Sequence, residues 1–471
     1  MTADGAPPIE EACYWLARAA HAARVAGDES ELPARERRRD TDIAIVGAGF
    51  TGLWTALFLK QLDPSVDVVI VEQGTTAYGA SGRNAGMVSA TIDHSHGLAV
   101  AHFGQGEAQR LAVLGLQNVE EMFTFLEAHD IECDLERSGT LHVALSTSHL
   151  DDLQADVACA ESLGVRDLRL LDRDETRAQI HSPRYEGALF DPSGAVLDPV
   201  RLALGLRRVA AALGVTILEQ TPVLALEDAG DTVRLRTADG EVVARRVILA
   251  TSAYTHHLLP IVRSRMIPLY DYVLVSEPLT PAQHETIGWR GRQGVTDVRT
   301  FFNYYRMTKD NRVLWGTSDA AYYGNNRTDV SCDHSERHYS ELRESFAHHF
   351  PALSDLDFPY AWGGAICATT RFTPFFGRAH DGRVLYGLGY TGHGLATTHL
   401  AGKILAHMAF ERQSPLLDLA LVREKPLPYP PEPLRTWAVN AVTRDLRRVD
   451  AGNPPSMLLR VLDALGMGLS S

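Results

Sequence analysis

The chain has 471 residues, of which 45% are hydrophobic and 22% charged, values that exclude low-complexity disorder and fibrous classes. Its 45 basic and 59 acidic side chains give a net charge of −14, which argues against a nucleic-acid partner because such proteins usually present a basic face. The five cysteines include no C-x-x-C pair, so neither a disulfide framework nor a metal site is expected.

A helix and a charged linker are predicted ahead of the main body. Residues Ile9–Arg24 repeat apolar side chains at helical spacing, and the charged stretch up to residue 40 is typical of a solvated linker. We expect residues 1–40 to pack outside the main body. The C-terminal tail, residues 413–471, contains a proline-rich stretch and is also expected to pack outside. Either segment could form a contact in a homo-oligomer.

A strand–helix–strand unit opens the main body. The strand Asp42–Val46 and the helix Gly49–Gln61 flank a G-x-G-x-x-G motif, and a second strand, Val66–Val71, ends at Glu72. The glycines of such a motif allow a tight turn, close approach of backbone to a pyrophosphate and close packing of a helix whose N-terminus favours phosphate. An acid at the position of Glu72 can accept hydrogen bonds from ribose hydroxyls and disfavours a 2′-phosphate. The unit predicts a dinucleotide site.

The next segment indicates which dinucleotide. Residues Gly79–Met87 are small, polar and rich in glycine, so their backbone could run against a flat ring system, while Ser81 and Arg83 could reach phosphate. A nicotinamide enzyme has no general need for such a segment. Taken alone, it is equally consistent with a surface loop.

The remainder of the chain mixes helices and strands. Asp239-Gly240 predicts a hairpin between two of the strands. Helices are expected at 107–129, 150–163, 199–213 and 395–410, strands at 140–145, 233–237, 242–250, 270–276, 313–316 and 384–389, and an extended tail at 426–433.

Taken together, these segments resemble the D-amino-acid-oxidase-like family of FAD-dependent amine oxidoreductases, in particular its gamma-glutamylputrescine oxidase branch. The resemblance also rests on Val247–Tyr254, Tyr304–Thr308 and Gly387–Gly394. It implies an α/β fold in which a Rossmann-like FAD-binding domain of the glutathione-reductase type is interleaved with a mixed-sheet α+β substrate domain. The implied FAD-binding segments are 41–95, 190–258 and 355–412, and the substrate-binding segments are 96–189 and 259–354.

The motifs and the resemblance assign one set of residues to FAD. A structural role in a tight turn is the alternative for His393. We expect non-covalent FAD, because Cys367 does not align with the cysteine that carries flavin in some relatives. The predicted FAD-binding residues are Gly47, Gly49, Phe50, Thr51, Gly52, Glu72, Gln73, Ala80, Ser81, Gly82, Arg83, Asn84, Gly86, Met87, Val223, Ala250, Thr251, Gly363, Gly389, Gly392, His393, Gly394 and Leu395.

The substrate prediction comes from departures from the family pattern. Where related α-amino-acid oxidases place an arginine that binds the substrate carboxylate, this chain has Ile366, and Arg371 replaces an aspartate. The lysine that sarcosine oxidases carry after the glycine-rich turn is also missing. An amine without an α-carboxylate is therefore expected, although Arg371 or Arg306 could bind an anion or form structural ion pairs. About half of the tyrosines in the substrate-domain strands are expected simply to pack in the core. The predicted catalytic residues are Tyr305, Arg306, Tyr272 and Tyr390.

The predicted reaction transfers a hydride from the carbon beside an amine nitrogen to flavin N5, giving an imine and then an aldehyde or keto product. Oxygen would reoxidise the flavin and yield hydrogen peroxide. The alternatives are a dehydrogenase with another electron acceptor and, less favoured, a tRNA-modifying enzyme or a non-catalytic FAD-binding protein. The apolar run Ile43–Leu59 is shorter than the roughly 20 residues of a membrane span, and no targeting segment is evident, so a cytoplasmic protein is expected.

Overall fold

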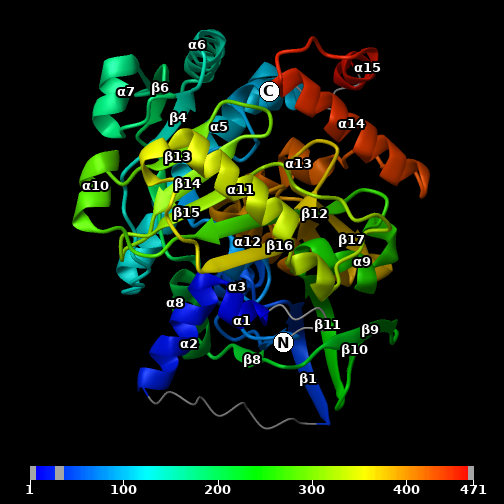
Figure 1. Cartoon of the computed structure of the whole chain (residues 1–471). Helices are drawn as coiled ribbons and strands as arrows, with labels where there is room; N and C mark the ends of the chain where they lie inside the picture. Colours follow the sequence, from blue (N-terminus) through cyan, green and yellow to red (C-terminus); the bar gives the residue numbers. More distant parts are fainter. Residues whose placement is uncertain (1–6, 27–36, 465–471) are drawn as a thin grey trace.

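The computed structural model describes residues 7–26 and 37–464. Within these residues two eight-stranded sheets and one two-stranded sheet are surrounded by helices, so the α/β class is confirmed. Figure 1 shows β1, β8, β9, β10 and β11 of the first sheet below the strands of the second, and helices α14 and α15 at the opposite end of the molecule from β1.

The first sheet has a parallel centre, in strand order β18-β11-β1-β2-β8. Ile45 of β1 pairs with Ile248 on one side and Ile70 on the other, and all three are fully buried, as an apolar run in a parallel sheet predicts. The predicted hairpin joins β10 to β11. The strands are β1 (Arg38–Val46), β2 (Val68–Val71), β8 (Thr216–Leu218), β9 (Val223–Asp228), β10 (Val233–Thr237), β11 (Glu241–Leu249), β17 (Phe375–Ala379) and β18 (Val384–Leu388).

Two apolar helices pack together against this sheet. Helix α3 (Phe50–Leu62) begins directly after the G-x-G-x-x-G turn, and α12 (Gly394–Phe410) follows the second glycine-rich turn. A Cβ atom on Gly402 would lie 2.8 Å from the backbone carbon of Trp54, so the two helices approach at glycine. Both helices therefore start at the same edge of the sheet.

The second sheet is mixed, in strand order β16-β12-β15-β14-β13-β4-β6-β5. Helix α11 (Glu336–His349) packs on one face, where Trp315, Tyr339 and Phe346 form a core. The strands are β4 (Thr140–Ala144), β5 (Arg169–Leu171), β6 (Gly187–Asp191), β12 (Ile267–Val275), β13 (Gly294–Asp297), β14 (Asn303–Met307), β15 (Val313–Thr317) and β16 (Tyr360–Ala368); the small third sheet pairs β3 (Met87–Val88) with β7 (Ala195–Val196).

The predicted helices are present, and the structure adds others that were not predicted, among them α7, α10, α11, α14 and α15. Helix α5 starts before the predicted helix 107–129 and breaks at Gly104, whose φ is 76°. Two helices follow the extended tail segment, although none was predicted there. The helices not yet given are α1 (Ile9–Ala12), α2 (Tyr14–Ala26), α4 (Ala80–Arg83), α5 (His96–Ala128), α6 (Thr147–Ser162), α7 (Arg173–Gln179), α8 (Pro199–Ala212), α9 (Thr255–Leu258), α10 (Pro281–Ile287), α13 (Ala420–Arg423), α14 (Leu434–Asp450) and α15 (Met457–Ala464).

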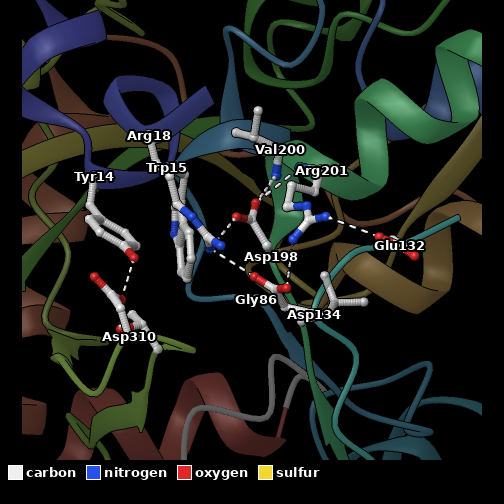
Figure 2. Close-up of polar contacts among 12 residues, drawn as sticks. Tyr14, Trp15, Arg18, Gly86, Glu132, Asp134, Asp198, Val200, Arg201 and Asp310 are labelled. Carbon is white, nitrogen blue, oxygen red and sulfur yellow. Dashed lines mark hydrogen bonds and ion pairs between the residues drawn. The ribbon is translucent and has the colours of Figure 1, made fainter. Parts of the chain in front are cut away.

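The N-terminal helix does not pack outside the main body, so that expectation is wrong. Trp15 on α2 is 1% exposed, and its Nε1 donates to the carbonyl of Asn84 at 2.9 Å. Figure 2 shows Arg18 reaching the carboxylates of Asp134 and Asp198, at 2.8 and 3.0 Å. The linker prediction for 27–36 lies outside the described residues, and β1 already begins at Arg38.

The two sheets interleave along the chain, but one predicted boundary needs correction. Strand β16 lies in the segment predicted for the FAD-binding domain, yet it pairs with β12 in the second sheet. The other domain limits stay a prediction. None of the described helices has the length and hydropathy needed to cross a membrane.

Candidate active site

A large cavity lies between the carboxyl ends of the central strands of the first sheet and one face of the second. Its volume is about 1440 Å³, larger than the roughly 300–1,000 Å³ typical of a pocket for one small ligand. Val46, Val71 and Ala250 line it from the first sheet, and Leu269 and Val273 line it from β12. Its size leaves room for a dinucleotide and a second molecule.

The glycine motif has the geometry that a nucleotide site requires. Gly47 has a φ of +107°, and a Cβ atom there would lie 2.8 Å from the carbonyl oxygen of Ala250. A Cβ atom on Gly52 would lie 2.0 Å from the carbonyl oxygen of Gly47, so only glycine lets α3 start this close to the turn. The N-cap residue Gly49 offers no side-chain cap, which leaves N–H groups of the first turn available to an anion.

Glu72 lies at the end of β2, beside this turn. Its carboxylate accepts hydrogen bonds from the backbone N–H of Ala48 at 2.8 Å and of Gly74 at 2.9 Å. Burial raises the pKa of this carboxyl group, and the two N–H groups oppose that shift. The carboxylate lines the cavity and could also accept hydrogen bonds from ribose hydroxyls.

The segment Gly79–Met87 folds over the same turn. Ser81 Oγ accepts a hydrogen bond from the N–H of Phe50 at 2.9 Å. The guanidinium of Arg83 is paired with Asp333 at 2.8 Å, but its Nη2 is buried and has no hydrogen-bond partner among the described residues. An unpartnered buried donor beside an open helix N-terminus fits the phosphates or polar ring atoms of FAD.

A second open helix N-terminus borders the same cavity. Helix α12 begins at Gly394, and its N-cap residue His393 makes no side-chain cap. The ring of His393 stacks on His94 with centroids 4.3 Å apart, and its buried Nδ1 has no hydrogen-bond partner within the part of the chain that the structure describes. Burial lowers the pKa of His393 well below its usual value, so the ring is neutral. A helix N-terminus here would stabilise negative charge on a reduced flavin.

Most of the residues predicted to bind FAD line this cavity, whereas five glycines stand behind its wall. FAD contact itself stays a prediction for the lining residues. The lining residues are Gly47, Gly49, Phe50, Thr51, Glu72, Gln73, Ala80, Ser81, Arg83, Asn84, Met87, Val223, Ala250, Thr251, Gly392, His393, Gly394 and Leu395. The residues outside the lining, for which direct contact is no longer expected, are Gly52, Gly82, Gly86, Gly363 and Gly389.

Two of the predicted catalytic tyrosines lie on the wrong face of the second sheet. Tyr305 is fully buried, stacks on Trp315 with centroids 4.3 Å apart and shares a hydrogen bond with Tyr185. Tyr272 donates to the carbonyl of Cys332 at 2.9 Å, on the side covered by α11. Neither residue lines the cavity, so both assignments are wrong.

Arg306 and Tyr390 have different surroundings. Arg306 is 1% exposed and donates to the carbonyls of Leu197 and Gly86 at 2.5 and 3.2 Å, outside the cavity lining. It therefore holds the back of the Gly79–Met87 segment, and its prediction as a catalytic residue is wrong. Tyr390 does line the cavity, and its hydroxyl accepts a hydrogen bond from Thr51 at 2.9 Å.

The neighbours of the mispredicted tyrosines face the cavity instead. Tyr304 and Asp271 both line it, and the Tyr304 hydroxyl donates to Asp271 Oδ2 at 2.6 Å. The N–H of Tyr272 donates to Asp271 Oδ1 at 2.8 Å. Burial raises the pKa of Asp271 to about 7, although both hydrogen bonds lower it. The Tyr-Asp-Tyr order of residues 270–272 was the available signal, since alternate residues of a strand face opposite sides.

The predicted loss of the carboxylate clamp agrees with the lining. Ile366 lines the cavity on β16, whereas Arg371 does not; the guanidinium of Arg371 donates to Thr373 Oγ1 and to the carbonyl of Glu424. Cys367 also lines the cavity, and burial raises the pKa of its thiol to about 12. A protonated thiol is a poor nucleophile, which favours non-covalent FAD.

Helix α14 closes the cavity from the C-terminal side. Asp450 at its end accepts hydrogen bonds from the N–H groups of Thr300 and Phe301, both at 2.8 Å, and Arg447 pairs with Asp319 at 2.9 Å. The residues of α14 that line the cavity recur at helical spacing: Ala438, Val439, Val442, Thr443 and Leu446.

Comparison with known proteins agrees with this geometry. The family model described as "FAD dependent oxidoreductase" (DAO) matches residues 42–408. Gamma-glutamylputrescine oxidoreductase of Escherichia coli is 32% identical over 368 residues, 78% of this chain and 83% of that protein. Probable oxidoreductase OrdL of Haemophilus influenzae is 29% identical over 384 residues, 80% of this chain and 84% of that protein.

Solved structures share the fold. Glycine oxidase from Geobacillus kaustophilus superposes with a TM-score of 0.67 at 21% identity, covering 82% of this chain and 99% of that one. L-proline dehydrogenase from P. horikoshii gives a TM-score of 0.67 at 16% identity, covering 81% of this chain and 96% of that one. The expected flavoenzyme fold and the expected FAD cofactor are confirmed.

Proposed function

The chain belongs to the FAD dependent oxidoreductase family, and we propose that it oxidises a C–N bond of a primary or secondary amine to an imine. Water then hydrolyses the imine to an aldehyde or ketone and releases the amine fragment. Bound FAD supplies the two-electron oxidant for the C–H bond beside the nitrogen. The name of the Escherichia coli relative, a gamma-glutamylputrescine oxidoreductase, supports an amine substrate.

One observation carries the choice of an amine over an α-amino acid. The cavity wall presents Ile366, an aliphatic side chain, where the resemblance implies an arginine for the substrate carboxylate. Burying a carboxylate against Ile366 without a cation would cost several kcal/mol of free energy, roughly the desolvation of an unpaired charge. An amine without an α-carboxylate avoids this cost.

The lining residues suit an amine that must lose a proton before oxidation. Phe302, Tyr304 and Phe372 add aromatic rings to the lining, and the α14 stripe adds aliphatic ones. Such surroundings exclude water and lower the pKa of a bound ammonium group, which raises the fraction of neutral amine. Aromatic faces also attract the cationic form as it enters.

The electron acceptor in this proposal is molecular oxygen, which would form hydrogen peroxide. The alternative is a dehydrogenase that passes electrons to another acceptor. The cytoplasmic location and the homo-oligomer stay predictions from the sequence.

The test is anaerobic titration of the FAD-loaded enzyme with amines and α-amino acids, followed by flavin absorbance. Rapid bleaching by a diamine, an alkylamine or a gamma-glutamylated amine, reversed by air with peroxide formation, is the expected result. Bleaching by α-amino acids alone would refute the argument from Ile366. Bleaching that air does not reverse would identify the dehydrogenase.

A pair of variants sharpens this test. Ile366→Arg places a cation in the wall and should raise kcat/KM for α-amino acids relative to alkylamines, whereas Ile366→Met, a neutral side chain of similar volume, should not. Equal substrate preferences in the two variants would show that position 366 does not face the substrate.

A further inference from the structure

The charged groups that line the cavity are unevenly balanced. Among the described lining residues there is no lysine, and both arginines are paired, Arg83 with Asp333 at 2.8 Å and Arg299 with Asp297 at 2.7 Å. Burial lowers the pKa of each lining histidine, which leaves the rings neutral near pH 7. The four histidines are His94, His142, His257 and His393.

Asp271 is a carboxylate in this lining without a cationic partner among the described residues. Other acids there are engaged or exposed: backbone N–H groups hold Glu72, Ser193 holds Asp191, Arg299 pairs with Asp297, and Asp152 and Asp156 lie on an exposed part of α6. Asp319, the nearest further acid, is paired with Arg447.

The surroundings of Asp271 hold its carboxylate in place in the cavity lining. The Tyr304 hydroxyl holds Oδ2, and the Tyr304 ring lies over Gly316, where a Cβ atom would come within 2.5 Å of that hydroxyl. Asp271 pairs in register with Gly364 of β16, and the Arg83 side chain lies over that glycine, where a Cβ atom would come 3.2 Å from its Cδ. The carboxylate is thus oriented by two hydrogen bonds and faces the cavity.

Asp271 lies close to Ile366, the residue that stands where the family pattern has a carboxylate-binding arginine. Ile366 pairs with Leu269 on β12, and Asp271 stands two residues further along the same face. The wall that would carry an arginine in α-amino-acid oxidases therefore carries an aliphatic side chain and an acid.

We propose that Asp271, oriented by Tyr304, is the residue that selects substrates with a second positively charged group, such as a diamine. This inference rests on the proposed amine oxidation and names its substrate class. One end of the molecule, a neutral amine, is oxidised, while the other end, an ammonium or similar cation, donates hydrogen bonds to Asp271. A charge-assisted pair of this kind in a buried site gives both affinity and orientation.

The first test measures binding without oxidation. Benzamidinium is a cation that has no C–H bond beside nitrogen, and benzamide is its neutral counterpart of similar shape. Calorimetric titration of the FAD-loaded enzyme should show benzamidinium binding more tightly than benzamide. The amide of Asp271→Asn can still accept from the Tyr272 N–H and can donate its own N–H to the Tyr304 hydroxyl, so the variant should weaken benzamidinium about 10- to 100-fold while leaving benzamide unchanged.

A matched control removes a charge elsewhere in the lining. Asp156→Asn changes an exposed acid at the edge of the cavity and should alter neither affinity, because water and salt screen that charge. The inference is wrong if wild type does not prefer benzamidinium, or if Asp271→Asn binds it as tightly as wild type does.

The second test uses turnover. Wild type should show a higher kcat/KM for 1,4-diaminobutane than for 1-aminopentane, and Asp271→Asn should remove that preference by lowering only the diamine value. An unchanged preference in Asp271→Asn would overturn the inference. If no amine reduces the flavin, the proposed function fails, and the benzamidinium titration still decides whether Asp271 binds cations.

Discussion

Helix α2 supports the back of the cavity wall, and we expect FAD affinity to depend on it. Trp15 is 1% exposed and donates to the carbonyl of Asn84, whose side chain in turn accepts from the N–H of Gly86 and donates to two carbonyls of α4. The Trp15 ring also lies 5.4 Å from the guanidinium carbon of Arg306. The substitution Trp15→Ala would remove these contacts from behind the Gly79–Met87 segment.

The magnitude follows from the burial of this side chain. Replacing a fully buried tryptophan by alanine costs about 3–5 kcal/mol of folding free energy. A loss of about 3 kcal/mol corresponds to roughly a 100-fold shift in an equilibrium. Part of this loss falls on the local order of the segment, so the FAD dissociation constant should rise about 10- to 100-fold, because only molecules with an ordered segment bind.

The assay compares two tryptophan variants. FAD affinity is measured by fluorescence titration of the apoprotein, and apoprotein stability by thermal unfolding. Trp437→Ala is the matched control because Trp437 on α14 is 70% exposed, so its loss should change stability by no more than about 0.5 kcal/mol. Trp15→Ala with reduced apoprotein stability and wild-type FAD affinity would refute the reasoning, since α2 would then stabilise the fold without shaping the site.

Three further predictions concern the cavity itself. Gly47→Ala should purify without FAD absorbance, because the residue has a φ of +107° and the new methyl group would lie 2.8 Å from the Ala250 oxygen. Val442→Trp should lower kcat/KM for long amines more than for methylamine, because it fills the lining of α14. Benzamidinium affinity should rise about tenfold per pH unit up to pH 7 and level off above, since the pKa of Asp271 is about 7; a pH-independent affinity would contradict this assignment.

The sign of the pH prediction depends on the groups around Asp271. Its raised pKa means that the carboxyl binds a proton below about pH 7, so the anion that attracts a cation forms only as the pH rises. Tyr304 stays protonated, because burial and Asp271 raise its pKa well above the usual value. The nearby acids Asp319 and Asp333 are each paired with an arginine, so the affinity should report the protonation of Asp271, and an Asp271→Asn variant should show no dependence.

The nucleotide half of the site could be predicted because its chemistry depends on local sequence. The G-x-G-x-x-G turn needs glycine at Gly47 and Gly52 for reasons of backbone conformation and distance, and both reasons are visible in the structure. Glu72 follows its strand directly, so its place beside the turn is fixed by the parallel pairing of β1 and β2. Short-range constraints of this kind leave few alternatives.

The substrate half could not be predicted in the same way. Alternation along β12 and β14 separates Asp271 from Tyr272 and Tyr304 from Tyr305, but it does not say which set faces the cavity. One face of this sheet packs against α11 and the other face lines the cavity, so aromatic residues occur on both faces. Which face lines the cavity depends on where α11 packs, and α11 is distant in sequence from β12 and β14.

The segments outside the matched family region explain why the family alone does not define the substrate. Residues 42–408 match the family model, yet α2 lies before this region and α14 after it. Helix α14 contributes an apolar stripe to the cavity and is held there by Asp450 and by the pair Arg447–Asp319. That pair removes the charge of Asp319 from competition and leaves Asp271 as the acid that a cation in the cavity would meet. Substrate choice in this chain is therefore expected to depend jointly on Asp271, in the family region, and on α14, beyond it.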